Sequence, residues 1–259
     1  MKKEKELLWG YIDRSGNYVI EPKYHKAGDY HEGLAVVKID WQSGYIDSKG
    51  EFVIPLRFQS ADNFHNGIAR VEEDDKWGFI DKKGEYVIEP IFENAEPFSD
   101  GLAMVAYQGK YGYIDAGGRF VIEPKYEAAG SFNDGVAKVF SDGRWSYIDV
   151  KGNSVPEPAK TPETFTNEAQ AFHDGLAVRE KDGKYGYVDE KEEFVIEPKY
   201  YIAEPFNGEL ARVKTGMKGK WIFIGRNGKP AFKEKFDQAM DFSEGLARVL
   251  TEVETEKGD

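Results

Sequence analysis

Acidic side chains recur at fixed spacing along the chain and are the first candidates for chemistry. One series follows an aromatic–aliphatic pair and comprises Asp13, Asp47, Asp81, Asp115, Asp149 and Asp189. Carboxylates can bind calcium, but a calcium loop supplies several acidic ligands within a few residues, and this spacing does not. In most cases a Gly stands three residues after the Asp, which is the signature of a type I turn whose Asp caps backbone amides. We therefore expect turn caps and no calcium site.

A second acidic series lies in the tripeptide Ile-Glu-Pro, at Glu21, Glu89, Glu123 and Glu197. A glycosidase needs two carboxylates in different environments at one place. Equivalent positions of a repeated sequence have similar environments instead. We expect solvated charges at a sheet edge, no catalytic residue and no enzyme.

Three of the four histidines, His31, His65 and His173, share one position of the sequence pattern. Elsewhere that position holds Ser or Asn, which cap loops through hydrogen bonds. A metal site needs three or four converging ligands, and the chain has no cysteine. Phosphate-binding and nucleophile motifs are also absent from the sequence. We expect no metal and no cofactor.

Aromatic residues form a further recurrent series that could stack against sugars. It comprises Trp9, Trp77, Tyr111, Trp145, Tyr185 and Trp221, together with Tyr11, Tyr45, Phe79, Tyr113, Tyr147 and Tyr187. One stacked core row is the simpler interpretation, and it is the one we favour. If the rings were exposed along a groove, a carbohydrate-binding module or a glycan-active protein would be the alternative function.

All these series belong to one internal repeat, which must be identified before the fold is considered. The tripeptide Tyr-Ile-Asp and its variants occur seven times, at steps of 34, 34, 34, 34, 40 and 36 residues. A second marker, Gly-Leu-Ala, recurs with it. The repeats start near residues 9, 43, 77, 111, 145, 185 and 221. We expect a single repeat domain over residues 1–259.

The sequence pattern of one repeat predicts four structural parts. Trp77 and Phe79 alternate with Ile80, which is strand behaviour. A turn follows, and then a second strand that Pro90 ends because proline cannot donate to a ladder. The three-residue spacing of Phe92, Ala95 and Phe98 favours a helical turn. A third strand begins at Leu102, so each repeat is predicted to be a three-stranded antiparallel meander with a crossing loop.

These residues resemble the bacterial WG repeat, named for its Trp-Gly pair. The pair is intact at Trp9-Gly10 and Trp77-Gly78, conservatively changed at Tyr111-Gly112 and Tyr185-Gly186, and altered at Ser43-Gly44, Trp145-Ser146 and Trp221-Ile222. The resemblance covers nearly the whole chain. It implies a non-catalytic scaffold and carries no shared active site.

The repeats favour a propeller-like toroid over an open β superhelix. The pairs Leu34-Ala35 and Val53-Ile54 would place apolar side chains on both faces of a sheet, which then needs neighbours on both sides. The last strand, 246–250, would pair with strand 8–12 and complete a split repeat without exposed edges. The superhelix is the alternative, because Gly225 replaces the repeat Asp in the last repeat, and a degenerate terminal repeat is typical of the cap of an open array.

Charge and composition limit the partners. The net charge is −12, and an acidic protein repels phosphate backbones and anionic membrane surfaces. The N-terminus lacks the apolar segment of a secretory signal, and no run is long enough to span a membrane. We expect a cytoplasmic monomer that binds a protein or peptide and neither nucleic acid nor membrane. A secreted or surface location is the alternative if a signal preceded residue 1.

Specific recognition should come from places where the repeat symmetry breaks. The largest break is the proline-containing stretch 155–172, whose expected contact residues are Lys160, Thr161, Glu163 and Thr164. A neutral insertion in a tolerant loop is the alternative. The second break is Ser43, which stands where Trp is expected. Trp41 lies two residues earlier and would share its face, so we expect Trp41 to fill the vacant core position. An exposed Trp at a hairpin tip, available to a partner, is the competing interpretation.

Overall fold

The computed structural model describes residues 2–158 and 171–257. Within these ranges the chain contains β-strands and no helix, so the expected all-β class is confirmed. No helix in this part of the chain is long and apolar enough to cross a membrane. The chain divides into two compact units. The first comprises Met1–Gly33, Ser48–Gly50 and Glu163–Asp259, and the second comprises Leu34–Asp47 and Glu51–Pro162.

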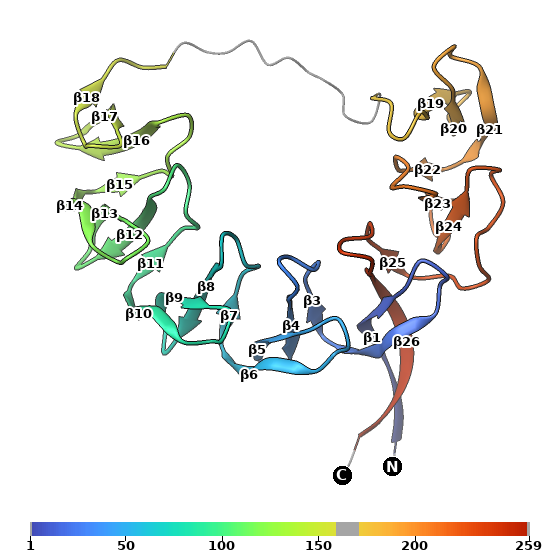
Figure 1. Ribbon diagram of the computed structural model, residues 1–259, viewed down its shortest axis with the longest axis horizontal. Helices are drawn as coiled ribbons and strands as arrows, with labels where there is room; N and C mark the ends of the chain where they lie inside the picture. The colour runs from blue at the N-terminus through green and yellow to red at the C-terminus, as the bar shows by residue number, and fades with distance from the viewer. Residues whose placement is uncertain (1, 159–170, 258–259) are drawn as a thin grey trace. The chain divides into compact units, whose positions relative to one another are not determined.

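The strands are short and form small antiparallel sheets, which Figure 1 labels along the chain. The first unit holds β1 (Lys2–Ile12), β2 (Tyr18–Tyr24), β3 (Lys26–Ala27), β19 (Ala177–Lys181), β20 (Lys184–Val188), β21 (Phe194–Tyr200), β22 (Ile202–Ala203), β23 (Leu210–Lys214), β24 (Trp221–Gly225), β25 (Gln238–Ala239) and β26 (Ala247–Lys257). The second unit holds β4 (Ala35–Ile39), β5 (Gln42–Ile46), β6 (Phe52–Phe58), β7 (Ser60–Ala61), β8 (Ile68–Glu73), β9 (Lys76–Asp81), β10 (Tyr86–Phe92), β11 (Asn94–Ala95), β12 (Ala103–Tyr107), β13 (Lys110–Ile114), β14 (Phe120–Tyr126), β15 (Ala128–Ala129), β16 (Val136–Ser141), β17 (Arg144–Asp149) and β18 (Ser154–Val155).

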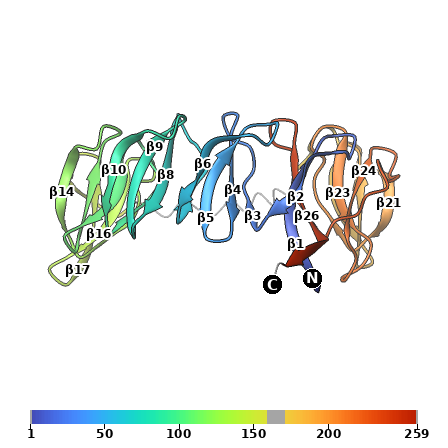
Figure 2. The same ribbon diagram turned by 90° about the horizontal axis from the view of Figure 1, so that it is seen from below.

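The predicted three-stranded meander is present, and β8, β9 and β10 illustrate it. Ile80 of β9 pairs with Ala69 of β8, and Phe79 pairs with Ile88 of β10. Figure 2 shows the three strands side by side. The crossing loop adds a fourth, two-residue strand, because Ala61 of β7 pairs with Val71 of β8.

The helical turn predicted for the crossing loop is wrong. Asn94 and Ala95 form β11, which pairs with Ala106 and Val105 of β12. The chain is extended here because the backbone groups of Asn94 and Ala95 are satisfied by the edge of the meander. The spacing of Phe92, Ala95 and Phe98 therefore reflects a short strand between two loop segments.

The expected strand end at proline is also wrong, since β10 continues through Pro90 to Phe92. Between the pairs Ile88–Phe79 and Phe92–Trp77, β10 has two more residues than β9. This is a β-bulge. Proline is tolerated in a bulge because the ladder does not use its nitrogen there.

The terminal strands pair as the split repeat required. Ile12 of β1 opposes Ala247 of β26, and the register continues without a shift through Trp9–Leu250 to Lys2–Lys257. Figures 1 and 2 both show the two strands side by side. Together with β2 and β25 they form one four-stranded sheet of the first unit. The choice between a toroid and an open superhelix stays a prediction, as does the single domain over residues 1–259.

Apolar side chains from both faces of the Leu-Ala-x-Val strands are buried, as expected. Leu34, Ala35 and Val37 are all less than a tenth exposed. The valines of the Val-Ile strands differ from the prediction, because Val53 and Val195 are 43% and 53% exposed. These outer strands are therefore buried on the isoleucine face only.

Candidate functional site

Most crossing loops of the described residues are held by an aromatic pair that the repeat supplies. The ring of Tyr45 in β5 lies 4.8 Å from that of Phe64 in the following crossing loop. The Tyr45 hydroxyl donates a 2.6 Å hydrogen bond to the carbonyl oxygen of Asp62. Tyr11, Tyr113 and Tyr187 donate in the same way to the carbonyl seventeen residues further on. Burial raises the pKa of Tyr45 far above its usual value, so the phenol stays protonated as this bond requires.

A second set of contacts joins several crossing loops to the crossing loop of the next repeat. The Ser99 hydroxyl donates a 2.7 Å hydrogen bond to the carbonyl of Phe132. Beside it, the Asp100 carboxylate accepts a 2.8 Å hydrogen bond from the backbone N–H of Gly135. The same carboxylate-to-amide contact joins Asp174 to Gly208 and Glu244 to Gly33. We call this contact the loop latch, and it fixes the spacing of adjacent crossing loops.

An arginine reinforces the junction between the second and third repeats. Arg70 of β8 forms a 2.7 Å ion pair with Asp62 and lies 3.7 Å from the Glu96 carboxylate. It also donates to the Ala95 carbonyl, and its guanidinium lies 4.3 Å from the ring of Trp77. The side chain is 17% exposed. Arg212 and Arg248 make the equivalent carbonyl contact in the first unit, and they pair with Asp241 and Asp29 of the next crossing loop. The arginine at this position therefore has a structural role.

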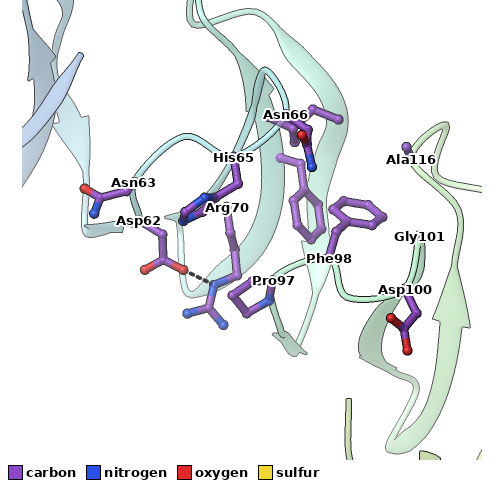
Figure 3. Close-up of a pocket in the computed structure, with 12 residues that line it drawn as sticks. Asp62, Asn63, His65, Asn66, Arg70, Pro97, Phe98, Asp100, Gly101 and Ala116 are labelled. Carbon is purple, nitrogen blue, oxygen red and sulfur yellow. Dashed lines mark hydrogen bonds and ion pairs between the residues drawn. The ribbon is translucent and has the colours of Figure 1, made fainter. Parts of the chain in front are cut away.

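A cavity of about 520 Å³ opens between the crossing loops of the second and third repeats. Figure 3 shows the residues that line it. The first loop contributes Asp62, Asn63, His65 and Asn66, the second contributes Pro97, Phe98, Asp100 and Gly101, and the walls are completed by Ile68, Arg70, Phe79 and Ala116. We call this cavity the inter-loop pocket. Its floor is aromatic, because the rings of Phe79 and Phe98 lie 4.9 Å apart, and its rim is polar.

The repeat symmetry breaks twice at the inter-loop pocket. Asn66 stands where Asp100, Asp174 and Glu244 form loop latches. In the described part of the chain, the N–H of Gly101 has no hydrogen-bond acceptor. The second break is Phe79, which replaces the tyrosine whose hydroxyl would bind the second loop. Both changes remove a contact from the same junction, and they leave polar backbone groups accessible to a ligand.

One further polar group of the pocket is unsatisfied. The Oδ1 atom of Asn63 is buried and lacks a hydrogen-bond partner within residues 2–158 and 171–257. Buried polar atoms are nearly always paired, so an unpaired one needs an explanation.

The Asp series caps turns, as predicted. The Asp81 carboxylate accepts hydrogen bonds from the backbone N–H groups of Lys83 and Glu85, at 2.9 and 3.0 Å. At Asp115 the corresponding bond from the Arg119 N–H lowers the pKa of the carboxyl group. The same capping bonds occur at Asp13, Asp47, Asp149 and Asp189. The Glu series is exposed, as expected for solvated charges at a sheet edge, and comprises Glu21, Glu89, Glu123 and Glu197.

The histidine position contacts the next repeat rather than its own loop. Where it holds Ser99, Asn207 or Ser243, the side chain donates to a carbonyl of the following crossing loop. His31, His65 and His173 occupy this position in other repeats. Across the ranges that the structure describes, no group of three or more His, Asp or Glu side chains is placed to hold a metal ion.

The aromatic series is divided between the core and half-buried positions. Tyr11, Tyr45, Phe79, Tyr113 and Tyr187 are at most 1% exposed. The indoles are covered by cations, since Arg248 lies 5.2 Å from the Trp9 ring and Arg212 lies 5.3 Å from Trp221. Guanidinium groups stack on such faces, so these rings do not offer a free platform for sugars. Trp145 differs, at 53% exposed.

The core position predicted for Trp41 is wrong. Trp41 is 84% exposed and lies at the hairpin tip between β4 and β5, next to Asp40 at φ 50°. Ser43 fills the buried position itself, at 3% exposed. The competing interpretation, an exposed tip residue, is the observed one. The other predicted contacts, Lys160, Thr161, Glu163 and Thr164, lie outside the described residues.

The fifth repeat is also irregular, because among its described residues the outer strand is only the two-residue β18. β18 pairs with β17 only at Val155–Tyr147 and Ser154–Ile148, whereas β14 continues to Tyr126 opposite Tyr111. A second cavity of about 620 Å³ lies beside this edge, next to Arg144, Trp145 and Ser146.

The family model described as WG containing repeat matches the chain at six places. The matches cover residues 9–40, 44–77, 77–111, 111–145, 185–221 and 223–252. Most of the irregular fifth repeat falls between the fourth and fifth matches. No curated protein matches the sequence.

Several solved structures have a related backbone. They include a crystal structure of the eukaryotic initiation factor (11% identity, TM-score 0.40, covering 89% of this chain and 73% of that chain). A streptogramin B lyase structure has 12% identity and a TM-score of 0.35, covering 97% and 98%. The N-terminal domain of Nup159 has 8% identity and a TM-score of 0.36, covering 96% and 95%. Likenesses at this level carry no argument about what the chain does.

Proposed function

The chain belongs to the WG-containing repeat family, and from this premise we propose that it is a non-catalytic scaffold that binds a protein or peptide partner. Repeat proteins present extended surfaces in which most positions maintain the fold. Binding specificity then depends on the positions that depart from the repeat. The proposal concerns the class of partner and leaves its identity open.

The inter-loop pocket is the observation that carries this proposal. It lies on crossing loops, where Asn66 and Phe79 break the repeat, and it combines an aromatic floor with polar groups that lack partners. Ligand sites are typically concave and apolar with a few polar groups that fix orientation. Pro97 and His65 are exposed at its rim, so a peptide can approach without displacing the core.

Selection of peptides from a random library on the full-length protein tests the proposal. The expected result is one enriched consensus whose binding is lost when the pocket is filled by Gly101→Leu. Gly135→Leu is the matched control, because Gly135 has the same backbone conformation (φ 77° against 81°) but its N–H is already engaged by Asp100. An absence of enrichment, together with binding on a glycan array, would contradict the proposal in favour of the carbohydrate-binding alternative.

The stretch 155–172 and Trp41 are proposed as further contact regions. Prolines in this stretch lower the entropy cost of ordering it on a partner. Shortening it to the length of the other repeats should abolish binding of the selected peptide or partner while the melting temperature is unchanged. Retained binding would show that the stretch is a neutral insertion.

A further inference from the structure

We infer that the inter-loop pocket binds a carboxylate group of a peptide, which completes the loop latch that Asn66 does not form. This inference rests on the proposed peptide-binding function and specifies the chemistry that the pocket recognises. The template is internal to the chain. At three junctions a carboxylate of one crossing loop accepts a 2.8 Å hydrogen bond from a glycine N–H of the next.

The vacancy at Asn66 has the right chemistry for this ligand. An asparagine in the left-handed region, at φ 54°, keeps the same backbone as Asp100 at φ 51° but has no negative charge. The Gly101 N–H is left without an acceptor in the described part of the chain. A hydrogen bond from a backbone N–H to an ionised carboxylate is among the stronger kinds in proteins.

The acidic residues around the pocket do not occupy the vacancy. Asp62 is paired with Arg70, and Asp100 is engaged in its own latch with Gly135. Figure 3 shows Asp62 joined to Arg70 on the side of the first loop, with Asp100 and Gly101 on the side of the second. The negative charge of Asp62 is therefore neutralised by Arg70, and the Asp100 carboxylate already accepts a hydrogen bond from Gly135.

An apolar feature indicates that the carboxylate belongs to a peptide rather than to a small ion. The partly exposed ring of Phe98, which packs on the buried ring of Phe79, offers apolar surface for a neighbouring side chain. A C-terminal residue with an apolar side chain supplies the carboxylate and this apolar contact, and so does an Asp or Glu next to an apolar residue.

Titration of the ¹⁵N-labelled protein with N-acetyl-phenylalanine tests the inference. The Gly101 amide resonance is expected to move downfield and to saturate, while the Gly135 resonance stays fixed because its acceptor is internal. N-acetyl-phenylalanine amide lacks the carboxylate, and its affinity should be weaker by about tenfold or more. A second arm with N-acetyl-aspartyl-phenylalanine amide distinguishes a side-chain carboxylate from a terminal one.

Two variants supply the decisive controls. Asn66→Asp should place the Gly101 resonance near the position of Gly135 without ligand, and should abolish the response to N-acetyl-phenylalanine. Asp100→Asn should transfer the response to Gly135. If the acid and its amide bind equally, or if Gly101 does not respond, the carboxylate inference is overturned. Peptides selected on the pocket would in that case still support the proposed function, so the two failures are distinguishable.

Discussion

Gly78 of β9 and Pro90 of β10 are in backbone contact across the bulge. A Cβ atom at Gly78 would lie 2.7 Å from the Pro90 nitrogen and 2.7 Å from the Ile88 carbonyl oxygen. The same close approach occurs at Gly10, Gly44, Gly112 and Gly186. Where the outer strand is lost or altered, the glycine is replaced by Ser146 and Ile222. The Gly of the Trp-Gly pair is therefore required by the bulged strand beside it.

This contact predicts that Gly78→Ala is strongly destabilising. The added methyl group meets backbone atoms, which cannot move aside as a flexible side chain would. The free energy of unfolding should therefore fall by at least about 1–3 kcal/mol. Urea unfolding followed by circular dichroism measures it. Ser146→Gly is the matched control and should cost at most about 1 kcal/mol, the ordinary penalty of a glycine in a strand. Equal effects at the two positions would contradict the bulge explanation.

Deletion of residues 245–259 should leave a protein that is unfolded or aggregated. It removes β26, including the fully buried Ala247 and Val249, and exposes β1. Loss of about four buried apolar side chains costs roughly 6–12 kcal/mol, which is comparable to the stability of a whole domain, about 5–15 kcal/mol. Truncation after Leu250 is the control, because the ion pairs beyond it, such as Lys3–Glu254, are exposed and contribute little. A soluble 245–259 deletion that melts cooperatively would refute the prediction.

Substitution of Trp41 should change fluorescence without changing stability. Trp41→Phe is expected to remove a red-shifted component that iodide quenches, because the indole is 84% exposed. The free energy of unfolding should change by less than about 0.5 kcal/mol, as for most surface substitutions. Trp77→Phe provides the contrast, since Arg70 covers that ring and quencher access should be low. A blue-shifted loss at Trp41 would contradict the exposed position.

Stability should fall at alkaline pH. Burial raises the pKa of Tyr45, Tyr113 and Tyr187 in the folded protein, whereas an unfolded tyrosine titrates near pH 10. Because the folded pKa is the higher one, their contribution is complete below about pH 10 and is lost as the pH rises above that value. Urea unfolding at a series of alkaline pH values measures the slope. Tyr45→Phe should make the slope shallower, and it should cost about 1 kcal/mol at neutral pH through the lost bond to Asp62.

The regular parts of the fold could be predicted from the sequence, because each marker has one local cause. Alternation at Trp77-Gly78-Phe79-Ile80 predicts the strand, and the recurring Asp predicts the turn cap. The pairing of strand 246–250 with strand 8–12 also follows, since a split repeat supplies complementary strands. These features require only the period of the pattern and the chemistry of single residues.

The errors arose where a residue depends on a distant partner. By itself Pro90 indicates the end of a strand. The bulge that lets the strand continue depends on the close approach of Gly78, which the local pattern does not report. The short strand at Ala95 depends on a free edge at Val105, which no local pattern reports. The inter-loop pocket could not be predicted, because Asn66 is an ordinary loop residue by itself. Asn66 matters for the pocket only because it does not accept a hydrogen bond from the N–H of Gly101, one repeat later.

The pairing of β1 with β26 has a consequence for synthesis. β1 is translated long before β26, the strand that completes its sheet. Until then β1 presents an unpaired edge, which is a template for association with other chains. Contacts between such distant segments also form slowly, because the chain must close a long loop first. Nascent chains should therefore depend on chaperones at β1 until β26 has been translated, whereas the second unit can fold before that point.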